Sequence, residues 1–253
     1  MKGLIGRTEA LLLIFLGLFM VTFAEGDTYW LLLNPKFQWV TTIGGLGIIL
    51  AGMGLFFIPA DHPRPTRIGV LVVFVAMLIS WDPEDAFVLP GNDLFSGPAA
   101  EQQPSRVQVE GREYVRINTA ELFLVADQGE PERTALNYVV QGVCKRTPEL
   151  DAKGQIALVR VAISCCLADA VGMGIRVAVD DPRKFESDVW LEVYGSLKAI
   201  EQADEKVRDL QIKGVFYTVL SQSHALVPDR IETMEQPGVP FIFEMRQEEP
   251  YAF

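Results

Sequence analysis

The sequence predicts a mixed α + β protein, with three N-terminal transmembrane helices followed by an extracytoplasmic, all-β domain of the small OB-like barrel type. Three observations lead to this prediction. Apolar runs fill the first third of the 253 residues, a proline-rich stretch follows, and short alternating segments occupy the rest. Hydrophobic residues make up 49% of the chain, more than an ordinary soluble domain carries. The excess lies in the first third, where a membrane region is therefore expected.

The apolar runs predict membrane spans at about 8–24, 38–59 and 66–81. A helix needs roughly 20 apolar residues to cross a bilayer, and the second run has that length by itself. The first and third reach it only if flanking residues such as Arg7 and Arg67 extend toward the lipid head groups. An alternative is that residues 1–24 form a cleaved signal peptide, which leaves two spans.

The positions of the basic residues predict the orientation, because Lys and Arg in short loops stay on the cytoplasmic side. Lys2 and Arg7 precede the first run, while Arg64 and Arg67 separate the second from the third. Trp30, Trp39 and Trp81 then gather at the outer interface. We expect a multi-pass protein of the inner cell membrane, with a cytoplasmic N-terminus and residues 82–253 outside the cytoplasm.

Charge and motif content exclude several classes of function. The formal net charge is −11, and all of the excess negative charge follows residue 81. Such a domain repels phosphate backbones, so nucleic acid is not expected as a partner. The sequence has no hydrolase elbow, Walker loop or HExxH motif, and only two histidines, which leaves few groups for acid–base catalysis. We therefore expect neither an enzyme nor catalytic residues.

Prolines mark residues 82–105 as an extended linker, and the β domain is expected at 106–253. Asn118 or Thr119 is expected to cap a short helix over 120–126. Segments with strand-like alternation follow at 136–146, 155–165, 174–179, 188–200 and 214–223.

Gly142 and Gly195 fall inside two of these segments, where a small barrel needs sharp bends. An OB-like barrel is the resulting prediction, and a small β-sandwich is the alternative.

Alternation also predicts which side chains point into the barrel. In the second strand it places one set inward (Ala157, Val159, Val161, Ile163 and Cys165) and another outward (Arg160, Ala162, Ser164 and Cys166). In the fourth strand the inward set is Val189, Leu191, Val193 and Leu197. Trp190 then points outward as a candidate partner contact, unless the linker or the acidic tail covers it.

The adjacent cysteines Cys165 and Cys166 admit three interpretations. They could hold a soft divalent metal such as zinc together with Asp169, with His224 or Cys144 as further ligands. They could be a redox pair, although adjacent cysteines close a strained ring. They could also be small apolar residues at the end of a strand. For Asp169 itself, capping the following turn is favoured over binding a ligand.

Small residues in the second span predict close helix packing. Gly47 and Ala51 are four residues apart and so lie on one helix face. The neighbouring helix belongs either to this chain or to a partner.

Several blocks of the chain resemble one known family. They are YWLLLNPKFQWVTTIGGLGIILAGMG, VVQGVCKR, RVAISCCLADAVGMGIRV, DVWLEVYGSL and PYAF, at 29–54, 139–146, 160–177, 188–197 and 250–253. These blocks are similar to the YcgQ-like family of bacterial membrane proteins, described as permease subunits. The Cys-Cys-x-Ala-Asp-Ala stretch is the most specific of them.

The resemblance implies an N-terminal membrane region, an exported β domain and a polytopic permease as partner. It also implies a link to metal homeostasis in some members, and some members carry a His-rich stretch between the two parts. This chain lacks that stretch and has only His62 and His224. The expected function is an accessory permease subunit whose β domain captures a ligand or gates the pore. The alternative is a stand-alone membrane-tethered metal- or solute-binding module that uses Cys165 and Cys166.

Overall fold

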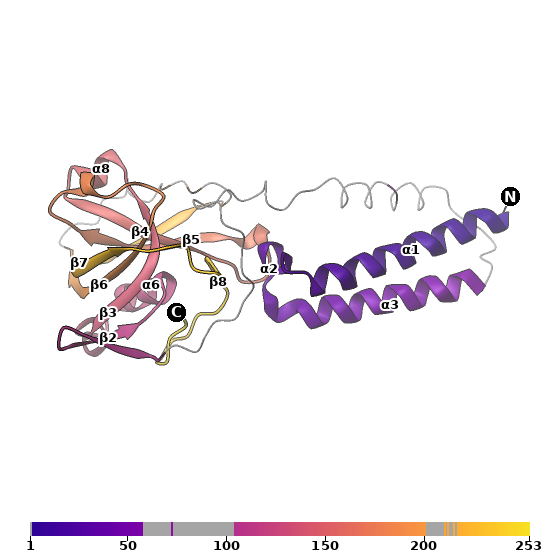
Figure 1. The fold of residues 1–253 in the computed structure, drawn as a ribbon, viewed down its shortest axis with the longest axis horizontal. Helices are drawn as coiled ribbons and strands as arrows, with labels where there is room; N and C mark the ends of the chain where they lie inside the picture. Colours follow the sequence, from indigo (N-terminus) through magenta and orange to yellow (C-terminus); the bar gives the residue numbers. More distant parts are fainter. Residues whose placement is uncertain are drawn as a thin grey trace. The chain divides into compact units, whose positions relative to one another are not determined.

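The structure is a computed structural model, and it describes residues 2–57, 72, 104–200, 210, 212, 215 and 217–253. The chain divides into two compact units, Met1–Ala86 and Phe87–Phe253. Figure 1 shows helices in the first unit and a curved sheet in the second. Each unit is described by itself below.

The first unit is a helical hairpin. Its elements are α1 (Lys2–Glu25), α2 (Tyr29–Leu32), a 3-10 turn (Pro35–Phe37) and α3 (Gln38–Phe57). Two of the described helical segments, Arg7–Glu25 and Pro35–Phe57, are long and apolar enough to cross a membrane, by length and composition alone. The first two predicted apolar helices are thus confirmed. The predicted third span, 66–81, lies outside the described residues except for Val72.

Glycines allow α1 and α3 to lie against each other. A Cβ atom on Gly45 would stand 2.9 Å from the carbonyl oxygen of Gly17, and one on Gly52 would stand 2.8 Å from Ile14 Cγ1. Real Cβ atoms do not approach other heavy atoms this closely, so these positions require glycine. The two helices therefore use Gly17, Gly45 and Gly52 for their mutual packing.

The second unit is built on a closed five-stranded barrel. Its strands are β3 (Asn137–Lys145), β4 (Gln155–Ala162), β5 (Val171–Ala178), β6 (Trp190–Ala199) and β7 (Thr218–Thr233). They pair in the order β3–β6–β7–β5–β4, and β4 returns to β3. Only the β5–β7 pair of this ring is parallel. The prediction of a small barrel is confirmed, and a two-sheet sandwich is not what forms.

Shorter strands and helices extend the barrel. They are β1 (Arg106–Val109), β2 (Arg112–Arg116), α6 (Thr119–Gln128), α7 (Pro131–Thr134), α8 (Pro148–Asp151) and β8 (Phe241–Ile242). The β1–β2 hairpin joins the sheet through β3, and β8 pairs in parallel with β4. Figure 1 shows α6 beside the barrel strands. Its apolar residues Leu122 and Val125 belong to the same buried core as the strand residues.

Both predicted glycine bends lie where two strands of the barrel approach each other closely. A Cβ atom on Gly142 would stand 2.9 Å from Leu158 Cγ, beside the β3–β4 closure. One on Gly195 would stand 2.9 Å from Pro228 Cα, where the β6–β7 register shifts. The last predicted strand, 214–223, begins too early and is too short, because β7 runs from Thr218 to Thr233.

The predicted inward face of β4 is wrong. Ile156 and Leu158 point into the main core, whereas Ala157 and Val159 pack in a second cluster with Leu150. Both faces of β4 are buried, so apolar residues occupy both and alternation cannot identify the inner one. In β6 the prediction is confirmed, because its alternate residues Leu191, Val193 and Leu197 lie in the main core.

Helix α6 begins with a capping box. Asn118 Oδ1 accepts the backbone N–H groups of Ala120 and Glu121 at 3.0 and 2.9 Å, and the Glu121 carboxylate accepts the N–H of Asn118 at 3.4 Å. The predicted cap is therefore Asn118 rather than Thr119.

Glu121 also fastens the C-terminal segment to the barrel. Its Oε1 accepts the backbone N–H groups of Arg246 and Ala252 at 2.6 and 3.0 Å. The side chain is 1% exposed. Burial raises the pKa of Glu121 to about 7, while the hydrogen bonds from these backbone groups oppose the rise.

The Gly52→Leu variant should weaken the α1–α3 hairpin, because its side chain collides with Ile14 and Ala10. Gly54→Leu is the matched control, since a Cβ atom on Gly54 meets nothing within 4 Å. Both changes add the same helix propensity, so their difference reports packing. Thermal melting of the detergent-solubilised chain, followed by helical circular dichroism, should give a lower midpoint for Gly52→Leu only. Equal midpoints would contradict this packing.

The Glu121→Gln variant should change how stability depends on pH. Because the folded pKa of about 7 exceeds the ordinary 4.5, the wild-type free energy of unfolding should fall as pH rises from 4.5 to 7. The fall relative to the variant should reach about 3 kcal/mol. Urea unfolding of the full chain in detergent, at several pH values, measures it. Glu149→Gln, at an exposed glutamate, should keep the wild-type slope.

Candidate functional site

The candidate site in the second unit is the loop between β4 and β5. Ile163 anchors its start, since this residue is buried and its N–H donates to the carbonyl oxygen of Ile242 at 2.9 Å. The chain then bends at Ser164 and Cys165 and enters a 3-10 turn, Leu167–Asp169. The loop thus leaves the sheet just before the two cysteines.

This bend brings the two sulfur atoms together. Cys165 Sγ and Cys166 Sγ are 3.5 Å apart, and both cysteines are free. Cys165 is exposed and Cys166 is half-buried. Strand alternation predicted opposite directions for them, but β4 ends at Ala162 and alternation does not extend into the loop.

Asp169 closes the loop from its far side. One carboxylate oxygen accepts the N–H of Ser164 at 3.0 Å, and the other accepts the N–H of Cys165 at 2.7 Å. These two bonds hold the carboxylate beside Cys165. Its geometry is that of a loop cap, the role favoured from the sequence.

The carboxylate and the thiol shift each other's pKa. The hydrogen bond to Asp169, followed by that to Cys166, raises the pKa of Cys165 to about 12. For Asp169, burial raises the pKa but the hydrogen bonds from Cys165 and the loop N–H groups outweigh it, so its pKa is below the usual value. Cys165 is therefore held as a neutral thiol at physiological pH.

The proposed zinc site gains no support from this arrangement. Among the described residues, no group of three or more His, Cys, Asp and Glu side chains could hold a metal ion. Cys144 lies in the main core, where burial raises its pKa to about 11. His224 contacts the carbonyl oxygen of Ala126 through Nδ1 at 2.8 Å. Cys144 and His224, the further ligands considered from the sequence, therefore make other contacts.

Trp190 is not an exposed contact residue. It is 3% exposed, and the guanidinium carbon of Arg160 lies 5.6 Å from its ring centroid. Arg160 is itself buried, with its N–H groups donating to the carbonyl oxygens of Val239 and Pro240 at 2.9 and 3.2 Å. The outward direction predicted for Trp190 left out this second layer, which covers the ring.

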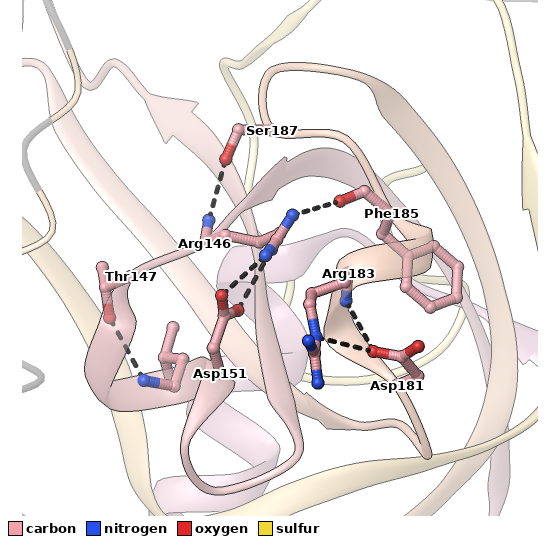
Figure 2. A network of polar contacts seen from close by, with 8 residues as sticks. Arg146, Thr147, Asp151, Asp181, Arg183, Phe185 and Ser187 are labelled. Atoms are coloured by element: carbon pink, nitrogen blue, oxygen red, sulfur yellow. Dashed lines mark hydrogen bonds and ion pairs between the residues drawn. The ribbon is translucent and has the colours of Figure 1, made fainter.

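A polar network that the sequence analysis missed joins two other loops of the barrel (Figure 2). Arg146, just after β3, forms two hydrogen bonds to Asp151 at 3.0 and 2.6 Å, and a third to the carbonyl oxygen of Phe185 at 3.1 Å. Arg183 and Asp181 pair beside it at 3.5 Å. The bond from Arg146, despite opposing burial, lowers the pKa of Asp151. These charges pair with one another, so we interpret the network as structural.

Only the local part of this network had a sequence signal. Thr147 precedes a proline and caps α8 by accepting the N–H of Leu150 at 3.2 Å. The contact between Arg146 and residue 185 joins distant segments and leaves no local pattern.

In the first unit, Gly47 and Ala51 lie on the face of α3 that α1 does not cover. Both are exposed, and a Cβ atom on Gly47 or on Gly54 would meet nothing within 4 Å. The small residues of α3 therefore include a packed pair, Gly45 and Gly52, and an open stripe of Gly47, Ala51 and Gly54. The neighbour expected for Gly47 and Ala51 is not α1.

The comparisons with known proteins concern the barrel unit. A family model described as the DUF1980 C-terminal domain matches residues 105–243. No curated protein matches the chain. A solved aspartyl tRNA synthetase from Entamoeba histolytica matches with 17% identity, over 60% of this chain and 28% of the synthetase chain, with a TM-score of 0.19. That score carries no argument about fold or function, and the YcgQ-like resemblance stays a prediction.

Asp169→Asn should make Cys165 more reactive. Without the carboxylate, the pKa of Cys165 should fall from about 12 toward its ordinary 9.0, and a larger fraction is then thiolate. Alkylation by iodoacetamide at pH 8, measured in a Cys166→Ser background, should be at least about tenfold faster. Asp181→Asn, which removes a carboxylate in another loop, should leave the rate unchanged. A rate that Asp169→Asn does not change would contradict this assignment.

Proposed function

The chain belongs to the family of the DUF1980 C-terminal domain, and on that premise we propose that it is a membrane-anchored accessory subunit of a permease complex. The family match covers the barrel and leaves the apolar helices α1 and α3 outside it. In this proposal the helices anchor the subunit and bind a polytopic partner. The barrel, of OB-like type, lies outside the cytoplasm and gates the partner.

The observation that carries the proposal is the division of small residues on α3. Gly45 and Gly52 pack against α1. On another face of α3, exposed small residues form an open stripe of Gly47, Ala51 and Gly54. In lipid, helices associate through close backbone approach at small residues, since apolar burial gives no preference for another helix over lipid tails. A second small-residue surface on an already paired helix supports a second helix as its partner.

The helices lack features of a transport path of their own. The window from Pro35 to Phe57 contains one charged residue, Lys36, at its beginning. The window from Arg7 to Glu25 has its charged residues near its two ends, at Arg7, Glu9 and Glu25. Charged or strongly polar side chains within a span usually mark ion and substrate pathways. Their scarcity here supports an accessory role, in which a partner provides the path.

The covered outer surface of the barrel favours a gating role over ligand capture. OB folds bind ligands on the outer face of their second and third strands, which correspond here to β4 and β5. On β4 that face presents Ala157 and Val159, and Leu150, Leu210 and Leu220 pack against them. Because the chain covers this surface itself, the barrel is better suited to contact a partner than to hold a solute there.

The Gly47→Leu, Ala51→Leu double variant should lose the partner while keeping its fold. Two leucines fill the open stripe and prevent close approach of another helix, so recovery of a multi-span permease with the tagged, solubilised chain should fall at least about tenfold. Quantitative mass spectrometry of the pull-down measures it.

Met53→Phe is the matched control, since it also adds bulk at an exposed position of α3 but lies two residues from Ala51 and therefore on another face. It should retain the partner. Photo-leucine in place of Leu55, an exposed residue one helical turn from Ala51, leaves the stripe unfilled and should label the same permease in the wild-type background. Recovery that the double variant leaves intact, or a crosslinker that labels only lipid, would refute the proposal.

A further inference from the structure

The β4–β5 loop presents two thiols that an accessory-subunit function does not use. Cys165 Sγ and Cys166 Sγ are 3.5 Å apart, neither is in a disulfide, and Cys165 is exposed. A disulfide bond is about 2.05 Å long, so the sulfurs must approach by about 1.5 Å. Cys165 lies in a bend, where side-chain rotation and a small backbone adjustment can supply that movement, while Cys166 is a single bridge residue with extended backbone.

The geometry points to Cys165 and Cys166 as a reversible dithiol–disulfide site whose co-reactant is a small-molecule disulfide. This inference goes beyond the proposed function and does not depend on it. In the first step the Cys166 thiolate attacks the disulfide RSSR, forming a Cys166–SR mixed disulfide and releasing RS⁻. In the second step Cys165 attacks Cys166 Sγ and expels the second RS⁻. Two protons leave the two thiols, so one RSSR becomes two RSH.

The position of Asp169 beside Cys165 gives the two cysteines different roles in the reaction. Its carboxylate accepts the N–H of Cys165 at 2.7 Å. This negative charge beside Cys165 disfavours a second negative charge on its sulfur, so Cys165 stays protonated while Cys166 makes the first attack. When Cys165 acts, its proton lies next to Asp169, which can pass it to solvent because the loop is exposed. The carboxylate thus stabilises the reduced pair and accepts the proton when the pair is oxidised.

Strain in the ring that the disulfide closes makes its formation reversible. Adjacent cysteines close a small ring that includes their own peptide bond, and departures from relaxed disulfide geometry make a bond easier to reduce. Strained and exposed disulfides have more oxidising potentials and are the labile ones. The closed form also changes the Cys165 backbone that Asp169 holds, so oxidation should alter the loop between β4 and β5.

The remaining cysteine is an internal reference. Cys144 is 0% exposed and lies in the barrel core with Leu158 and Leu191. It should react with neither the small disulfide nor an alkylating reagent until the chain is unfolded.

The test uses the full chain in detergent, equilibrated with mixtures of reduced and oxidised glutathione, trapped by acid and alkylation, and analysed by peptide mass spectrometry. The wild-type chain should form a Cys165–Cys166 disulfide with little glutathione adduct. Cys165→Ser should retain glutathione on Cys166, because the residue that resolves the adduct is gone. Circular dichroism of each variant confirms the fold.

Two outcomes would overturn the inference. One is a wild-type chain that keeps both thiols free over the whole series, and the other is a wild-type chain that accumulates the glutathione adduct as Cys165→Ser does.

Asp169→Asn separates this role from a purely structural one. Loss of the carboxylate should favour the disulfide by about tenfold in the equilibrium constant, which lowers the reduction potential by about 30 mV. Asp181→Asn should leave the potential unchanged. A potential that Asp169→Asn leaves unchanged, or raises, would overturn the assignment of Asp169.

Discussion

The closure of the sheet at β3 is the constraint on which the second unit depends. This strand pairs with β6 along most of its length and with β4 through Val143, Cys144 and Lys145. The double pairing turns an open sheet into a ring, so the five barrel strands have no free edge between them. It also creates the enclosed core that α6 covers with Leu122 and Val125. Gly142 sits beside the closure because a larger residue would collide with Leu158.

Close backbone approach has opposite consequences in the two units. In the barrel, glycines such as Gly142 and Gly195 occupy positions where another strand of the same barrel lies against them. In the helical hairpin it is used on one face only, by Gly45 and Gly52, and the other face keeps small residues without a neighbour in the described part of the chain. The hairpin helices are long and apolar enough to span a membrane, and a helix that does so can leave a face of small residues for another helix.

Sequence reasoning succeeded where a single segment carries the signal. The strands of the barrel, the Asn118 cap, the buried face of β6 and the two glycine bends follow from local periodicity and turn chemistry. It failed where distant segments decide. Both faces of β4 are covered, so its alternation is uninformative, and Trp190 is buried by Arg160 from another strand. At the candidate site the sequence identified Cys165, Cys166 and Asp169 but not their arrangement, because strand alternation ends one residue before the loop.

The burial of Arg160 has a consequence for synthesis of the protein. Its guanidinium donates to the carbonyl oxygens of Val239, Pro240 and Phe241, and burial lowers its pKa only to about 10, so it stays charged. A buried charge without hydrogen-bond partners is costly. On the ribosome, a nascent chain that has emerged as far as β7 lacks these carbonyls. Such a chain cannot bury β4 completely, and the barrel reaches its native state only after residues 239–241 can pack against Arg160.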